Sequence, residues 1–114
     1  MTTTLTSQQG LKLWHEALTA SVRAEGPDLS ARQMAIFLQV YLAPPPHTVR
    51  GLAAALRISK PAVVRALDTL GRADFPRRKR DETDKRNVLI QRTVKGSVFL
   101  SEFSEWVVTA SEKL

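Results

Sequence analysis

The fold of this chain is decided by residues 75–96, which read FPRRKRDETDKRNVLIQRTVKG. A segment rich in Arg and Lys, residues 76–80, precedes a polar turn at 81–87 and an apolar segment at 88–90. Two short segments of this kind on either side of a polar turn predict a β-hairpin. A hairpin with cations at its tip is suited to lie along the groove of a nucleic acid.

Two short helices are predicted just before this hairpin. Thr48 is placed to cap the first, from Val49 to about Leu56, and Ser59 to cap the second, residues 60–72. The turn at 57–59 between them gives a helix–turn–helix, and the hairpin that follows makes the whole a winged helix. In the second helix the apolar stripe should be buried and the opposite side exposed, with Ala62 at the edge; the outward residues are Pro61, Arg65, Asp68, Thr69 and Arg72.

Three further helices complete the predicted fold. We expect the first from Ser7, as its cap, to about Ala24, and the last from Val94 to about Ala110 after a Thr93 cap. A helix at 31–42 begins with a capping box, Ser30 with Gln33. Its apolar residues lie nearly all round, which predicts a central, buried helix. We also expect the left-handed backbone conformation at Asp74.

Length and composition place the chain among single folded domains. Of its 114 residues, 43% are hydrophobic, which is enough for a core. We divide the domain into an N-terminal helix (1–28), a winged-helix core (29–96) and a C-terminal helix (97–114). The absence of cysteine excludes disulfides and thiolate metal sites. No apolar run is long enough for a membrane span and no secretion signal is visible, so we expect a cytoplasmic, nucleoid-associated protein without membrane contact.

The positive charge is concentrated in the middle of the chain. The net charge is +6 and the isoelectric point about 10.3. Residues 1–43 are neutral, residues 44–71 carry +3, residues 72–95 carry +5 and residues 96–114 carry −2. Because the excess coincides with the helix–turn–helix and the hairpin, we interpret it as a footprint for DNA phosphates.

These two motifs together resemble the MarR family of winged-helix transcriptional regulators of bacteria and archaea. The resemblance runs from Leu29 to about Leu100. It implies a mainly α fold with a small β-wing, a homodimer, and binding of double-stranded DNA to control transcription. The positions that match the family's pattern, in order, are Thr48, Leu52-Ala53, Ile58, Ser59-Lys60, Arg65, Leu70, Arg77-Arg78, Arg80-Asp81, Asp84-Lys85-Arg86, Val88-Leu89-Ile90 and Thr93-Val94-Lys95-Gly96.

The chain also departs from that pattern. Asp74 stands where the family usually has Gly, and Arg92 where it usually has Leu. Pro61 and Ala62 replace polar residues of the recognition helix, which predicts modest sequence specificity. The chain ends near the end of the fifth helix, where family members continue into the region that forms their dimer and borders their ligand pocket. We therefore expect a small or differently built dimer through the first and last helices, and we do not expect the small-molecule effector pocket.

The resemblance and the charges together define the expected DNA contacts. Recognition helix 60–72 would enter the major groove, where Arg65 can reach a guanine edge or a phosphate. Wing 76–91 would grip the flanking backbone or the minor groove, with Arg86 braced by Asp84. Because side chains alternate along a strand, at least two of the four cations at 77–80 should be solvated or paired. The expected DNA-contacting residues are Arg57, Ser59, Lys60, Pro61, Ala62, Arg65, Thr69, Arg78, Arg80, Asp84, Lys85 and Arg86.

The sequence contains no pattern typical of an enzyme, a metal site or a bound cofactor. His15 and His47 lie far apart without a carboxylate cluster near either, so we interpret both as surface or helix-end residues. Two alternatives to a transcriptional regulator stay open. One is an architectural or replication-associated DNA binder with little sequence preference. The other is a winged-helix module whose basic face docks on an acidic protein.

Overall fold

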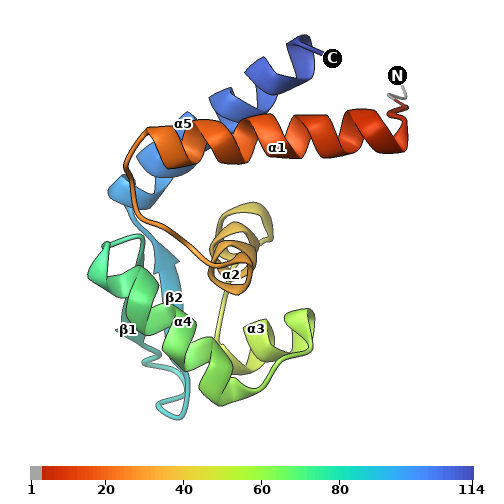
Figure 1. Ribbon diagram of the computed structural model, residues 1–114. Coiled ribbons are helices and arrows are strands. Elements are labelled where there is room, and N and C mark those ends of the chain that lie inside the picture. The colour runs from red at the N-terminus through yellow and green to blue at the C-terminus, as the bar shows by residue number, and fades with distance from the viewer. Residues whose placement is uncertain (1–3) are drawn as a thin grey trace. The chain divides into compact units, whose positions relative to one another are not determined.

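The structure is a computed structural model that describes residues 4–114 (Figure 1). Over these residues it contains, in order, α1 (Ser7–Arg23), α2 (Ala31–Leu42), α3 (Val49–Leu56), α4 (Lys60–Arg72), β1 (Pro76–Arg80), β2 (Val88–Arg92) and α5 (Val94–Glu112). This order confirms the predicted winged helix. Residues 29–97 form one compact unit, here called the winged-helix unit. Residues 4–28, which include α1, and residues 98–114 form a second, here called the helical-pair unit.

Local side-chain chemistry explains where the helices begin. The Ser30 hydroxyl accepts a hydrogen bond from Gln33 N, and Gln33 Oε1 accepts one from Ser30 N, as the predicted capping box requires. Thr48 likewise caps α3, as predicted. The predicted cap of the first helix is wrong by one residue. Thr6, not Ser7, caps α1, because it forms a second capping box with Gln9.

The core of the winged-helix unit lies between α2, α4 and the hairpin. Phe37 of α2 is buried and stacks on Phe75 at a centroid distance of 4.9 Å. The other fully buried side chains of this unit are Ile36, Val40, Leu52, Val63, Leu67 and Leu70. The predicted burial of α2 fails at its last residue, Leu42, which is 78% exposed. The chain leaves the helix in an extended conformation at Ala43, and Leu42 points away from the core elements.

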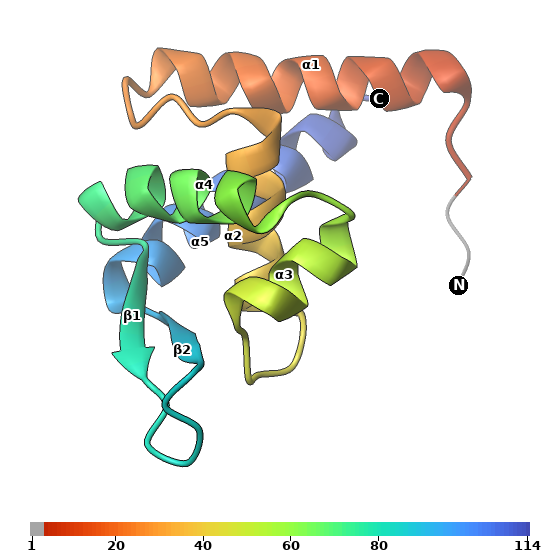
Figure 2. The same ribbon diagram turned by 90° about the horizontal axis from the view of Figure 1, so that it is seen from below.

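The two strands pair in an antiparallel hairpin, with Arg78 opposite Ile90 and Arg80 opposite Val88. The free edge of β2 is held by the connector before α3, because Ile90 N donates a hydrogen bond to His47 O at 2.8 Å. His47 is therefore only 8% exposed, and its Nε2 bonds to Ala43 O at 3.1 Å. His47 is therefore not a surface residue, but it does lie at a helix end, directly before the Thr48 cap of α3. Figure 2 shows the turn of the hairpin projecting away from the helices of this unit.

The junction between β2 and α5 is fixed by Tyr41, a residue of α2. Its hydroxyl accepts a hydrogen bond from Thr93 N at 2.8 Å and lies 2.7 Å from Phe75 O, to which it donates. The Thr93 hydroxyl caps α5 by accepting from Gly96 N. Arg92 completes the junction, since its guanidinium donates to the carbonyl oxygens of Val40 and Ala43 at the end of α2. Helix α2 thereby fixes the end of the hairpin and the start of α5.

Asp74 adopts the predicted left-handed conformation, with φ 59°. Its N–H donates to Gly71 O, and the N–H of Phe75 donates to Leu70 O. These two bonds form the Schellman motif that ends α4. The motif turns the chain from α4 into β1 and so sets the position of the hairpin beside α4.

In the helical-pair unit, α1 and the later part of α5 run in opposite directions. Gly26 approaches Phe99, whereas Glu16 lies 4.0 Å from Lys113 at the other end. Ala17, Phe103 and Ala110 are buried at the contact. Phe103 packs edge-on against two tryptophans, Trp14 and Trp106. No helix of residues 4–114 is both long enough and apolar enough to span a membrane.

Candidate nucleic-acid interface

The start of α4 presents an exposed, positively charged helix end. The Ser59 hydroxyl accepts a hydrogen bond from Ala62 N at 3.2 Å, which confirms Ser59 as the cap. Lys60 and Pro61 follow it, and both are exposed. Arg57 is also exposed and ends α3 in the left-handed conformation, with φ 54°. Cations beside free backbone N–H groups at a helix N-terminus form a favourable place for a phosphate.

Further along α4, only some of the predicted contact residues have exposed side chains, and the others are hydrogen-bonded within the protein or buried. Arg65 is exposed, and within residues 4–114 its guanidinium makes no ion pair. Thr69 is half-buried, and its hydroxyl donates to Arg65 O and accepts from Arg72. Ala62 is 6% exposed, so its side chain belongs to the core instead of the outward side. A position at the edge of the apolar stripe is buried here because α2 packs against α4.

The basic strand is anchored to the recognition helix through Arg78. Its Nη2 donates to Asp68 Oδ1 at 2.6 Å and lies 3.4 Å from Val64 O, both on α4. Both side chains of the ion pair are about half exposed. On the opposite side of the strand, Arg77 pairs with Asp74 at 3.4 Å. Two of the four cations at 77–80 are therefore paired, while Lys79 and Arg80 make no ion pair in the described part of the chain.

The tip of the wing is organised by two aspartates. Asp84 accepts from Arg86 Nε at 3.0 Å through one carboxylate oxygen and from Arg86 Nη2 at 3.1 Å through the other. This fork holds the pKa of Asp84 below its usual value, and the nearby charge of Arg50 lowers it further. Asp81 accepts from the backbone and hydroxyl of Thr83, and these bonds also lower the pKa of Asp81. Lys85 and Arg86 are exposed at this tip.

Two contributors to this surface were missed in the sequence. Asp81 shapes the wing tip, and the signal was an Asp followed two residues later by Thr, which is typical of an Asx turn. Arg50, on the first turn of α3, is close enough to Asp84 for its charge to act on that carboxylate. Arg50 lies near the wing because an antiparallel β-bridge joins Thr48 to Leu89. No local sequence pattern predicts this bridge.

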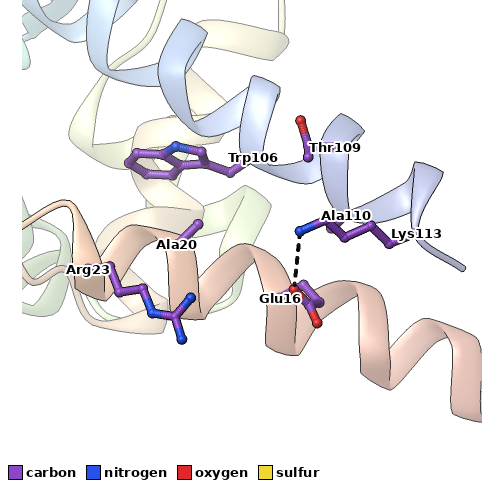
Figure 3. A pocket seen from close by; sticks show the side chains of 7 residues that line it. All are labelled: Glu16, Ala20, Arg23, Trp106, Thr109, Ala110 and Lys113. Atoms are coloured by element: carbon purple, nitrogen blue, oxygen red, sulfur yellow. Dashed lines mark ion pairs between the residues drawn. The ribbon is translucent and has the colours of Figure 1, made fainter.

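A small pocket lies elsewhere, on the helical-pair unit. Figure 3 shows the indole of Trp106 over Ala20, with Glu16 and Lys113 joined across the two helices. Arg23, Thr109 and Ala110 complete the lining. It contains neither the recognition helix nor the wing and contributes nothing to the basic surface described above. No group of three or more His, Asp or Glu side chains in residues 4–114 could hold a metal ion.

Comparison with known structures identifies the fold independently. A mutant of MepR from S. aureus superposes with a TM-score of 0.76 at 19% identity, covering 96% of this chain and 82% of that one. CouR, a transcriptional repressor bound to a 23-mer DNA duplex, superposes with a TM-score of 0.71 at 26% identity, covering 93% of this chain and 72% of that one. A mutant of MarR from E. coli in complex with operator DNA superposes with a TM-score of 0.68 at 22% identity, covering 88% of this chain and 66% of that one.

Sequence comparison with curated proteins gives no match. The sequence profile of the MarR family, however, matches residues 29–88, which is more than half of the chain and includes the helix–turn–helix and most of the wing. The protein therefore belongs to the MarR family and is a DNA-binding transcriptional regulator, not an enzyme.

Proposed function

We propose that α4 enters the major groove of double-stranded DNA while the wing tip contacts the flanking backbone or the minor groove. The observation that carries this proposal is the ion pair between Arg78 and Asp68. It joins the wing to the outward side of α4, the side that also presents Arg65. The ion pair thereby brings the cations of both elements onto one basic surface. The DNA-bound state of CouR, a relative of the same fold, supports this assignment.

The side chains take different roles on this surface. Arg65 reads a base edge or orients the helix, while Arg57, Ser59 and Lys60 hold phosphate. Pro61 gives van der Waals contact. Thr69 lies one turn further along α4, where its hydroxyl donates to the backbone oxygen of Arg65 and accepts from Arg72. On the wing, Lys85, Arg86 and Arg80 contact the DNA, with Asp84 orienting Arg86. Arg78 anchors the wing, and the buried Ala62 is not assigned a contact.

Arg65→Ala is expected to weaken binding to a preferred duplex by about 1–3 kcal/mol, because a bidentate contact to a base is lost. The loss on random DNA should be smaller. The preferred duplex is first obtained by selecting from a random pool with the purified protein, and affinities are measured by fluorescence anisotropy. Arg23→Ala, which removes one exposed charge from α1, serves as the matched control and should leave both affinities unchanged. Equal losses on both DNAs would make Arg65 a phosphate contact.

We further propose that the protein pairs as a two-fold homodimer through α1 and α5. One stripe of α1 is apolar and open to solvent: Leu11 is 74% exposed, Trp14 47%, Leu18 41% and Val22 75%. These residues recur at helical spacing, so they form a continuous surface on the helix. A helix–turn–helix reader gains affinity when two copies engage half-sites about one helical turn apart. As a regulator of chromosomal DNA, the protein would be located in the cytoplasm with the nucleoid.

Sedimentation across a concentration series is expected to show a monomer–dimer equilibrium. Leu11→Lys should shift it toward monomer, because a charge would be placed in the apolar seam. Leu42→Lys is the matched control, since Leu42 is as exposed as Leu11 but lies in the winged-helix unit. A monomer at every concentration, both alone and on palindromic DNA, would contradict the dimer and leave the winged-helix assignment unchanged.

A further inference from the structure

A groove in the winged-helix unit lies between the first turn of α2 and the outward side of α4. Its lining consists of Ser30, Ala31, Arg32, Gln33, Ala62, Arg65, Ala66 and Thr69. Three of the lining residues are alanines, whose side chains are short. No acidic residue is among the lining residues. Arg32 and Arg65 are both exposed and supply the charge of the groove.

The side-chain acceptor oxygens of this groove already have partners within the protein. The Ser30 hydroxyl oxygen accepts from Gln33 N, and Gln33 Oε1 accepts from Ser30 N, in the capping box of α2. The Thr69 hydroxyl donates to Arg65 O within α4. The two guanidinium groups remain, and within residues 4–114 neither is in an ion pair. A groove whose charged groups are two cations, with its acceptor oxygens already engaged and no carboxylate in its lining, is complementary to an anionic chain.

We propose that this groove receives the sugar–phosphate backbone beside the major groove entered by α4, and that Arg32 binds a phosphate there. The inference rests on the proposed function, because Arg65 belongs both to the outward side of α4 and to the groove. The two surfaces are therefore continuous. A DNA strand that leaves the major groove over Arg65 would enter the groove that Arg32 also lines. Arg32 is thus a positioning residue that fixes the orientation of the protein on the duplex without reading its sequence.

Arg32→Gln is expected to weaken binding about tenfold on preferred and on random DNA alike, since a phosphate contact carries no sequence information. The slope of log affinity against log salt should flatten by about 0.9, the contribution of one neutralised phosphate. Arg23→Gln is the matched control and should change neither quantity. The melting temperature of Arg32→Gln should stay at the wild-type value, because the Arg32 side chain makes no hydrogen bond or ion pair within residues 4–114.

Ethylation interference locates the contact directly. One backbone phosphate should block binding of the wild-type protein when ethylated and have no effect on Arg32→Gln. If the interference pattern, the affinity and the salt slope of Arg32→Gln all equal those of the wild type, while Arg65→Ala still weakens binding, the groove is not a backbone site and the proposed function stands. A loss confined to the preferred duplex would also overturn the inference, because it would indicate a base contact. Absence of DNA binding by the wild-type protein would refute the proposed function itself.

Discussion

Binding of one protomer to its DNA half-site is expected to weaken about a thousandfold when salt rises from about 50 to about 200 mM. Each neutralised phosphate contributes about −0.9 to the slope of log affinity against log salt. If each exposed cation of the proposed surface neutralises one phosphate, the expected slope is about −5 for one protomer. These cations are Arg57, Lys60, Arg65, Arg80, Lys85 and Arg86. Fluorescence anisotropy with a labelled duplex at a series of NaCl concentrations measures the slope.

The wing tip provides an internal control for this slope. Arg86→Ala removes a cation and should flatten the slope by about 0.9, and it also leaves the Asp84 carboxylate unpaired beside the DNA. Combining it with Asp84→Asn should restore part of the lost affinity, because a charge that repels phosphate is then removed. An affinity that does not change with salt would contradict the phosphate footprint.

The sequence predicted those parts of the fold that depend on local chemistry. Ser30, Thr48 and Ser59 each cap the helix assigned to them, because a cap bonds within three residues of itself. The left-handed turn at Asp74 was predictable for the same reason. The burial of His47 was missed because it depends on β2, which lies more than 40 residues away in the chain. Leu42 was expected in the core because α2 is apolar nearly all round, but the helix ends at this residue and leaves it exposed. Periodicity cannot indicate which partner a face will meet.

The same distinction applies to the candidate interface. The pair of Asp84 and Arg86 was expected from their two-residue spacing and is present. The pair of Arg78 and Asp68 was not, because it joins β1 to α4 across ten residues and a turn. The structural role of Arg92 was likewise not predictable, because it depends on residues far away in the sequence. Arg92 departs from the family's pattern in the sequence, and its contacts with Val40 and Ala43, 52 and 49 residues earlier, give it a role at the end of α2.

Gly96→Ala is expected to lower the free energy of unfolding by about 3 kcal/mol, at the upper end of the cost of overpacking. A Cβ at this position would collide with the Tyr41 hydroxyl and approach Phe75 O to 2.5 Å. The hydroxyl cannot retreat without losing its bonds to Thr93 N and Phe75 O. The helix propensity of Ala, favourable by about 1 kcal/mol relative to Gly, offsets only part of this cost. Urea denaturation followed by circular dichroism gives the free energy.

Gly71→Ala is the matched control, because Gly71 also lies in a helix but a Cβ there would meet no atom within 4 Å. It should raise stability by about 0.5–1 kcal/mol, so the two glycine substitutions are expected to differ in sign. Tyr41→Phe combined with Gly96→Ala should cost less than the sum of the two single changes, because removing the hydroxyl frees part of the space for the new Cβ. Additive costs, or a Gly96→Ala variant as stable as the wild type, would show that Tyr41 does not fix the start of α5. A coupled cost would establish that one hydroxyl of α2 holds together the end of α4, the end of the wing and the first turn of α5.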